Sequence, residues 1–209
     1  WTRLAPKPLE GGGLAPEPVK AQWGVAEDEA MTKIVAKGET VATAHLAHSV
    51  HVEVEGLKPD RWYWYDFKAG SEVSPKGRSR TLEHASRPAA DTSALKIAFA
   101  SCQHFESGHY TAYEHMLAES PDLVLHLGDY IYEGPGKPAK PGKPEKFRTH
   151  VGPEIKTLEQ YRNRHAQYKT DAALQAMHAA APWAVTWDDH EFDNNCAGDI
   201  PEEKGPATT

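Results

Sequence analysis

Three short segments of the sequence carry side chains of the kinds that bind metal ions. Ser101 to His104 offers a thiol, Gly128 to Glu133 offers carboxylates and phenols, and Asp188 to Glu191 offers carboxylates and an imidazole. A buried carboxylate needs a cation or hydrogen-bond donors, because the desolvation of a bare ion is very costly. The three segments therefore predict a metal site, provided that the fold brings them together.

The predicted secondary structure places each segment directly after a strand. Apolar runs predict strands at Leu95 to Ala100, Leu123 to Leu127 and Trp183 to Trp187. Helices are expected at about 108–119 and after a capping box formed by Thr157 and Gln160, with Asp171 capping a second helix. Apolar strands joined by helical crossovers predict a largely parallel sheet, whose ligand sites gather at the carboxyl ends of the strands.

Each of these residues also has an ordinary structural interpretation. Cys102 alone fits a small buried apolar side chain, Asp129 alone fits a helix cap, and the acids of 188–191 alone fit a solvated turn. A lone His190 is more typical of a surface or core histidine than of a catalyst. The metal site is favoured because the ordinary interpretations require three independent coincidences at one end of a sheet.

The two cysteines of the chain allow one disulfide bond but do not form a disulfide framework. Cys102 ends an apolar strand, whereas Cys196 lies in a polar segment. Two separate roles are therefore favoured over a bridge between them.

The first part of the chain has the alternation of half-buried strands. Strands are expected around 19–23, 33–36, 40–44, 50–54, 62–67 and 77–81. The spacing Leu57-x-Pro59-x-x-x-Tyr63-x-Tyr65 resembles the corner of fibronectin type III and immunoglobulin-like sandwiches, with Tyr63 as the corner tyrosine. Residues 1–90 are therefore predicted to form an immunoglobulin-like β-sandwich domain.

The composition changes around Glu83 to Ser93, where polar residues and proline are typical of a linker. We expect a domain boundary there, with the α/β domain covering 91–209. Within it, Lys- and Pro-rich residues 134–148 predict an exposed insertion. That insertion is either a solvated loop or a basic lip beside an anionic or lipid-surface substrate.

Composition excludes some classes of function. The formal net charge of -7 disfavours a general nucleic-acid binder, because affinity for the phosphate backbone comes from an excess of Lys and Arg. The sequence has no apolar run long enough to span a bilayer. Contact with a lipid surface, if it occurs, is expected to be transient.

The motifs together resemble a known family. Ala100-Ser101-Cys102-Gln103, Pro121 to Glu133 with its Leu127-Gly128-Asp129-Tyr130 centre, and Thr186 to Glu191 with Asn194-Asn195 are similar to the PhoD family of alkaline phosphatases and phosphodiesterases. That family includes a secreted, metal-dependent phospholipase D, and it carries an immunoglobulin-like domain before its metallophosphatase domain. The resemblance implies a secreted phosphoester hydrolase acting on phosphodiesters, phospholipid headgroup esters among them.

Two other functions remain open at this point. An alkaline phosphomonoesterase is the alternative within the same class, and a non-catalytic binding module stabilised by metal is the alternative from another class. The motifs do not separate a diesterase from a monoesterase.

The resemblance also implies roles for individual residues. Ferric iron (Fe³⁺) would be held by Cys102 and Tyr132, with Asp129 bridging to calcium (Ca²⁺) and Asp189 on the calcium side; another divalent cation could replace calcium. Thiolate and phenolate suit a trivalent iron, and carboxylate oxygens suit calcium. His190 would hydrogen-bond to the charge that develops on the substrate or protonate the leaving group.

Three further residues are weaker candidates near the substrate or behind the ligands: His104, Asn194 and Asn195. The family's metallophosphatase domain needs further downstream ligands that this chain does not contain. We therefore expect the C-terminal remainder of the same polypeptide, as a separate associated fragment, to complete the site, and the chain alone to be inactive.

Overall fold

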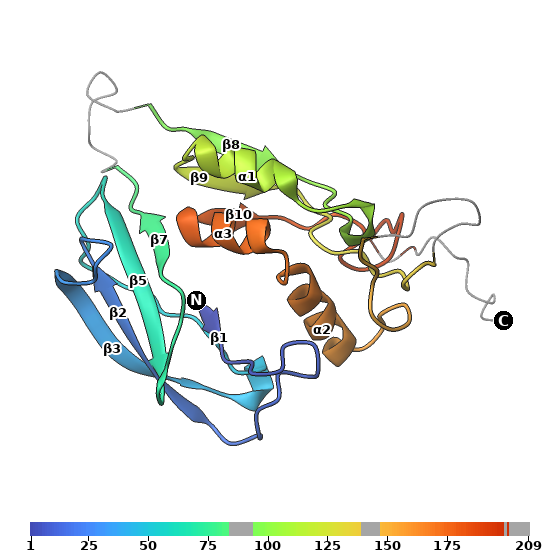
Figure 1. Cartoon of the computed structure of the whole chain (residues 1–209), viewed down its shortest axis with the longest axis horizontal. Helices are drawn as coiled ribbons and strands as arrows, with labels where there is room; N and C mark the ends of the chain where they lie inside the picture. The colour runs from blue at the N-terminus through green and yellow to red at the C-terminus, as the bar shows by residue number, and fades with distance from the viewer. Residues whose placement is uncertain (84–93, 139–146, 199, 201–209) are drawn as a thin grey trace.

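The computed structural model describes residues 1–83, 94–138, 147–198 and 200 of the 209-residue chain. These residues form two lobes, a β domain at the N-terminus and an α/β domain after it (Figure 1). The predicted boundary near residue 90 and most of the predicted basic insertion lie outside the described residues. Among the described helices, none has the length and apolar character needed to cross a membrane.

The β domain is an antiparallel, sandwich-like structure, as predicted. Its larger sheet has the order β3-β2-β5-β6, with β7 also paired to β5, and a smaller sheet pairs β1 with β4. The strands are β1 (Thr2–Arg3), β2 (Val19–Ala26), β3 (Ile34–Ala42), β4 (Ser49–Val50), β5 (Trp62–Ala69), β6 (Glu72–Val73) and β7 (Gly77–Arg80), with a 3-10 turn, η1 (Ala44–Leu46), before β4.

Two local expectations in this domain turned out differently. The segments predicted around 33–36 and 40–44 form the single strand β3. The strand predicted over 50–54 is limited to Ser49–Val50. Residues 51–55 alternate in burial as predicted, but their backbone pairs with no strand among the described residues. The tyrosine corner has the predicted geometry, since the Tyr63 hydroxyl accepts a hydrogen bond from the Lys58 backbone N–H at 3.0 Å.

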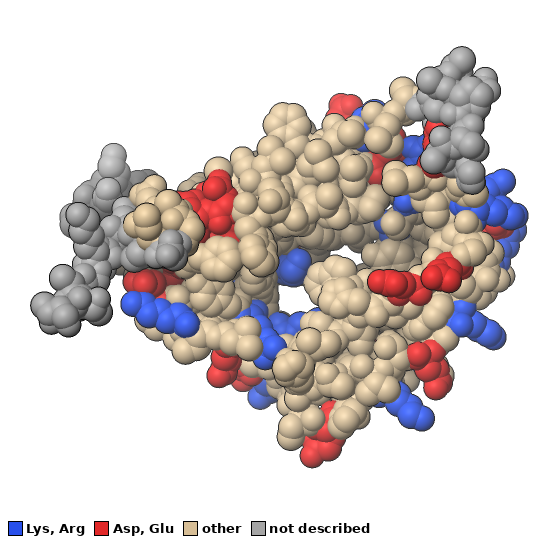
Figure 2. Space-filling model, turned by 180° about the vertical axis from the view of Figure 1, so that it is seen from behind, with Lys and Arg blue, Asp and Glu red and all other residues tan. Residues whose placement is uncertain are grey.

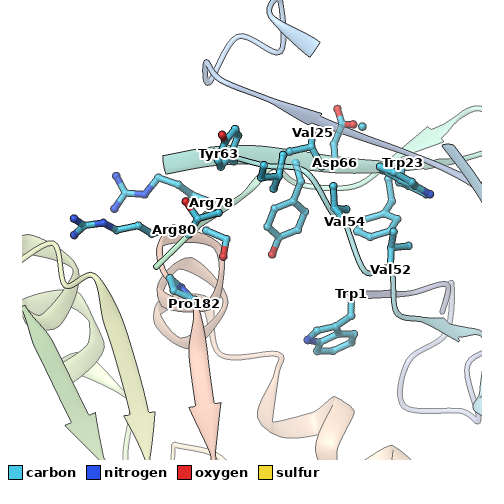
Figure 3. Close-up of a pocket in the computed structure, with 16 residues that line it drawn as sticks. Trp1, Trp23, Val25, Val52, Val54, Tyr63, Asp66, Arg78, Arg80 and Pro182 are labelled. Carbon is cyan, nitrogen blue, oxygen red and sulfur yellow. The ribbon is translucent and has the colours of Figure 1, made fainter. Parts of the chain in front are cut away.

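The inner face of the larger sheet borders a cavity of about 270 Å³. Trp23, Val52 and Val54 line it from the β domain, and Pro182 reaches it from the α/β domain (Figure 3). Val52 and Val54 face the interior, as the alternation of apolar residues predicted, although they do not belong to a strand. The sheet is therefore covered partly by its own loops and partly by the second domain.

The α/β domain holds a three-stranded parallel sheet with the order β10-β9-β8, which confirms the predicted parallel arrangement. Its elements are β8 (Ile97–Ala100), η3 (Phe105–Ser107), α1 (Thr111–Ala118), β9 (Leu123–His126), α2 (Leu158–Tyr168), α3 (Ala172–Ala180) and β10 (Trp183–Val185). Ile97 and Phe99, which share one face of β8, are both exposed, so the described residues leave that face of the strand uncovered.

The predicted helix caps are present. The Thr157 hydroxyl accepts from the Gln160 N–H at 3.3 Å, and the Gln160 side chain accepts from the Thr157 N–H at 2.9 Å, completing the capping box. Asp171 accepts from the Leu174 N–H at 3.0 Å and so caps α3. Its second carboxylate oxygen accepts from Arg148 at 2.7 Å, so this arginine of the predicted basic insertion forms a buried ion pair.

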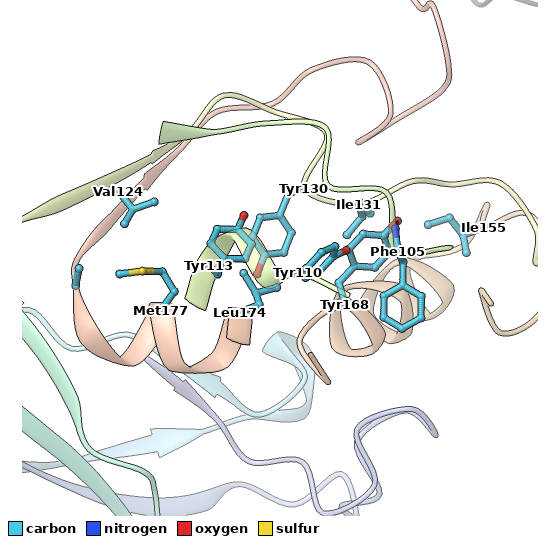
Figure 4. Packing of buried hydrophobic residues seen from close by; sticks show 11 residues of the cluster. Phe105, Tyr110, Tyr113, Val124, Tyr130, Ile131, Ile155, Tyr168, Leu174 and Met177 are labelled. Atoms are coloured by element: carbon cyan, nitrogen blue, oxygen red, sulfur yellow. Dashed lines mark hydrogen bonds between the residues drawn. The ribbon is translucent and has the colours of Figure 1, made fainter. Parts of the chain in front are cut away.

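The core of the α/β domain is rich in tyrosine. Tyr110, Tyr113, Tyr130 and Tyr168 pack together with Leu174 and other apolar residues beneath the sheet (Figure 4). The hydroxyl groups of Tyr110 and Tyr113 each donate a 2.6 Å hydrogen bond to Gln103, to its carbonyl and its side-chain oxygen respectively. These bonds fix the loop that follows β8, and with it the neighbouring Cys102.

Arginines of β7 join the two domains. Arg80 binds Asp60 of its own domain at 2.5 Å and also Asp122, which precedes β9. Arg78 donates to the Ala180 carbonyl at the end of α3 at 2.9 Å. The β domain is thereby anchored to both layers of the α/β domain.

Candidate metal centre

The loops after β8 and β9 lie side by side at the carboxyl edge of the parallel sheet. The backbone pairing of these strands continues into the loops, with Cys102 N–H donating to the Gly128 carbonyl and Gln103 N–H to the Asp129 carbonyl, both at 3.2 Å. The Tyr132 hydroxyl donates to Asp129 Oδ2 at 3.0 Å and also interacts with the Cys102 side chain. The thiol, the phenol and the carboxylate therefore meet at one point.

The loop after β10 completes the group. One ligand atom each from Asp129, Asp189 and His190 lie within 4.8 Å of one another. Asp129 is buried, and Asp189 and His190 are half-buried. The structure thus brings together all five residues that the sequence singled out as metal ligands or catalyst.

Both cysteines lie near this edge of the sheet. Cys102 is exposed, so its interpretation as a small buried apolar side chain was wrong. Cys102 and Cys196 are both free thiols, and no bridge joins them. Cys196 lies instead near the Asp189 carbonyl, with its sulfur 4.0 Å from that oxygen.

The backbone at this edge is held in an unfavourable conformation. Cys102 and Asp129 both have left-handed backbones, with φ of 54° and 53°. Such residues cost roughly 1–3 kcal/mol each and persist only where their surroundings hold them in place. Gly128 has φ of 105°, and a Cβ there would lie 2.5 Å from the Asp188 Cβ, so the loops after β9 and β10 touch directly.

Glu191 is the residue that holds these two loops together. Its buried carboxylate accepts backbone N–H groups from Asp129 at 3.0 Å and Asp188 at 2.7 Å on one oxygen, and from Tyr130 at 2.5 Å on the other. Sequence reasoning treated Glu191 only as part of an acidic segment. The structure shows that it positions Asp129, because charge-assisted hydrogen bonds of this kind are strong.

Glu133 has the corresponding role for His190. Its carboxylate binds His190 Nδ1 at 2.7 Å and accepts the Asn194 N–H at 3.2 Å on its other oxygen. Because a carboxylate only accepts, Nδ1 carries a proton, and Nε2 of a neutral ring is left as the acceptor. Sequence reasoning missed this role of Glu133 as well.

The three weaker candidates lie at the edge of the same site. His104 packs edge-on against Tyr132, with 4.6 Å between the ring centroids. The Asn195 N–H donates to Asp189 Oδ2 at 2.5 Å, and this bond is the main reason why the pKa of Asp189 lies below its usual value. Asn194 contributes its backbone N–H to Glu133, so the two asparagines help to shape the turn that carries Asp189.

The donor set fits bound cations. Asp129 Oδ1 is buried and has no hydrogen-bond partner among the described residues, while Oδ2 receives the Tyr132 hydroxyl. A buried carboxylate oxygen in that state, beside Asp189 and His190, is compensated by a positive ion. Without an ion, burial and then Asp129 raise the pKa of Tyr132, and a bound cation would act in the opposite direction.

Comparisons with known proteins agree with this architecture. Residues 1–83 match the family model "PhoD-like phosphatase, N-terminal domain", and residues 97–209 match "PhoD-like phosphatase". The chain is 55% identical over 204 residues to "Alkaline phosphatase D" of Bacillus subtilis (strain 168), covering 97% of this chain and 34% of that protein.

A solved structure described as "Structure of PhoD" superimposes with a TM-score of 0.91 at 53% identity, covering 99% of this chain and 39% of that one. The chain thus spans about a third of the length of the curated relative that it matches. With both family models matched in order along the sequence, the chain belongs to the PhoD-like phosphatase family.

Proposed function

We propose that the complete polypeptide is a metal-dependent phosphoester hydrolase that acts on phosphodiesters, phospholipid headgroup esters of the phospholipase D type among them. The observation that carries this proposal is the buried Asp129 carboxylate, which keeps one oxygen without a described partner where three loops meet. The similarity to alkaline phosphatase D supports the general class, a phosphoester hydrolase.

In this proposal Cys102 and Tyr132 would hold ferric iron, Asp129 would serve as a ligand to both metals, and Asp189 would hold calcium or another divalent cation. Bound cations would supply Lewis-acid stabilisation of the phosphoryl oxygens and of the charge that develops on them. The protein's part is to fix the ligand atoms. Glu191 does so for Asp129, and in the structure the hydrogen bond from the neutral Tyr132 places its phenol oxygen beside that carboxylate.

His190 is the proposed general acid. Glu133 fixes its ring through Nδ1 at 2.7 Å, so the other nitrogen can carry a proton to a leaving alkoxide when the imidazole is charged. The ring lies 4.1 Å from that of Tyr132, centroid to centroid, which places the acid beside the proposed iron ligand.

We further propose that the remaining part of the polypeptide, which makes up most of the length of the curated relative, supplies the missing downstream ligands. It could do so as an associated fragment or as one continuous chain. Secretion of the enzyme is also part of the proposal and follows from the family resemblance. Fractionating cells that express the complete gene tests it, and an enzyme retained in the cytoplasm would contradict it.

The experiment that tests the function uses the complete protein. We expect purified enzyme to contain iron and calcium and to hydrolyse bis-nitrophenyl phosphate faster than the corresponding monoester. Asp129→Ala is expected to lower turnover by roughly a thousandfold and to reduce the metal content, because it removes a carboxylate that would hold the metals.

Several outcomes would revise the proposal. Faster hydrolysis of the monoester indicates a phosphomonoesterase. Metal binding without turnover of either ester indicates the binding module. Iron bound by a phenolate and a thiolate should colour the protein. Full activity in an iron-free, colourless preparation therefore contradicts the ligand assignment of Cys102 and Tyr132. Asp122→Ala, which removes a carboxylate outside the site, serves as the control for folding and for the contact between the domains.

A further inference from the structure

A second charged region lies in a cavity between the two domains, away from the proposed reaction. This cavity has a volume of about 1010 Å³, with α2 on one side and the β1 and η1 segments on the other. Figure 2 shows that the molecule is hollowed between its lobes and that Lys and Arg atoms border the hollow. The region from Glu191 to Phe192 reaches the cavity from the metal centre.

Three cationic side chains converge on the cavity. Arg162 lies on α2, Lys169 follows the last residue of that helix as its C-cap, and Arg3 faces them from β1. Arg162 donates to the His45 carbonyl at 2.7 Å and Arg3 to the Ala47 carbonyl at 3.1 Å, so both arginines bind the η1 turn. Burial and then the neighbouring Arg162 charge lower the pKa of Arg3.

These charges are not compensated within the described part of the chain. Arg3 Nη2 is buried and has no hydrogen-bond partner there, and none of the three cations forms an ion pair with a described carboxylate. Among the described residues that line the cavity, Glu191 is the one acid, and both its oxygens already accept backbone N–H groups. This is notable in a chain of net charge -7, where carboxylates are plentiful.

Lys169 lies against two aromatic rings at the edge of the cavity. Its ammonium group lies 5.1 Å from the ring centroid of Trp1 and 4.9 Å from that of Tyr130, and it donates to the Tyr130 hydroxyl at 3.1 Å. Burial lowers its pKa to about 8. The hydrogen bonds to the η1 turn account for one guanidinium nitrogen of Arg162 and one of Arg3. They account neither for the unpartnered Nη2 of Arg3 nor for the position of Lys169.

We propose that this cavity binds an organic phosphate, an anion with an apolar substituent, whose phosphate is held by Arg3, Arg162 and Lys169. Arginine guanidinium groups bind phosphate oxygens in a bidentate manner, and a cluster of cations favours a doubly charged anion over a carboxylate. Leu46, Leu158 and Phe192 in the cavity wall provide the apolar contact for the substituent. This site is distinct from the metal centre and does not depend on the proposed hydrolysis.

Calorimetric titration of the complete protein with n-hexylphosphonate tests the proposal, because hydrolysis of a phosphoester cannot cleave its P–C bond. We expect a binding event, separate from any binding of the phosphonate at the metal centre, that Asp129→Ala leaves in place and that Arg3→Gln weakens roughly tenfold or more, since charge-assisted hydrogen bonds are lost. Arg61→Gln, the same change at an exposed arginine of the same domain, is the matched control and should leave binding unchanged. Turnover of bis-nitrophenyl phosphate should be the same in both arginine variants.

A second variant protects the test against misfolding. Lys169→Met removes the charge but preserves the length of the side chain. It should weaken n-hexylphosphonate binding, and thermal unfolding should show that the fold is intact. If both Arg3→Gln and Lys169→Met bind the probe as the wild type does, the ligand lies elsewhere and the proposal is wrong.

Two further observations would also overturn it. Inorganic phosphate that binds as tightly as n-hexylphosphonate would remove the role of the apolar wall. A crystal structure of the complete protein with one of its own carboxylates on Arg3 Nη2 would show that the cations are paired internally. Absence of any turnover would contradict the proposed hydrolase function alone, since binding to the cavity is measured separately.

Discussion

The carboxyl edge of the parallel sheet and the cavity between the domains both bury charge, but they compensate it differently. At the edge, Glu191 and Glu133 are acids whose partners are N–H groups of neighbouring loops. In the cavity, Arg3 and Lys169 are cations with no described carboxylate beside them. The buried acids at the edge thus have hydrogen-bond partners within the protein, whereas the cations in the cavity lack a carboxylate partner.

This difference separates charges that build the structure from charges that bind a ligand. A buried charge with a full set of protein partners fixes the chain, whereas one with an open polar atom calls for an ion from outside. Asp129 Oδ1 at the edge and Arg3 Nη2 in the cavity are two of the buried atoms that have no partner among the described residues, one on an anion and one on a cation. They suggest a cation site and an anion site in one molecule.

Replacing Glu191 by Gln at the carboxyl edge of the sheet should have the largest effect. An amide nitrogen cannot accept the N–H groups that one carboxylate oxygen now receives, so Asp129 loses its support. We expect metal affinity and turnover of the complete enzyme to fall roughly 100-fold, and the free energy of unfolding to fall by about 1–3 kcal/mol. Metal titration, kinetics and urea denaturation measure the three effects.

Glu114→Gln on the exposed face of α1 is the control for this change. If Glu191→Gln lowered stability but left the metal affinity as it is in the wild type, Glu191 would be a structural residue without influence on the site.

Replacing Glu133 by Gln sharpens the role of His190 and should have a smaller effect. Gln can still accept from Nδ1, but its neutral amide forms a weaker hydrogen bond than the carboxylate does and holds the imidazole ring less firmly. We expect kcat to fall roughly tenfold for a diester with an alkyl leaving group, and less for one that releases nitrophenolate, which needs no proton. Equal losses with both substrates would argue against His190 as general acid.

Lys169→Met probes the cavity through pH and should give the smallest effect. The pKa of Lys169 falls from 10.5 to about 8 on folding, so between these values the unfolded chain binds more protons and the wild type gains stability as pH rises. The variant lacks this gain. Its free energy of unfolding relative to the wild type is therefore expected to decrease across that window in urea titrations.

The same substitution at the exposed Lys68 serves as the comparison. A stability difference between Lys169→Met and the wild type that stays constant across the window would mean that Lys169 is well solvated in the folded protein.

Much of the fold was predictable because its signals are local. The capping box at Thr157 and the cap at Asp171 depend on residues three positions apart, and the Tyr63 corner spans five. The meeting of Cys102, Asp129 and Asp189 was also predictable, since parallel strands bring their carboxyl ends to one edge. The sequence thus predicted which residues gather, without predicting what holds them.

The supporting contacts were not predictable because they join distant parts of the chain. Glu191 binds backbone groups about sixty positions away, and Arg162 reaches the His45 carbonyl across 117 positions. Backbone donors and acceptors are the same for nearly all residue types, so the sequence does not reveal these two partners. An acid directly after a histidine at a strand end is the one hint that Glu191 offered.

The direct contact between Gly128 and Asp188 has a consequence for how such a site can change over time. With no room for a Cβ between the two loops, neither can be lengthened, exchanged or displaced without rebuilding the other. The loops after β9 and β10 must therefore change together in evolution. Grafting a single one of them from a related enzyme should fail where grafting both together succeeds. Variation among relatives should therefore concentrate in segments that do not touch this contact.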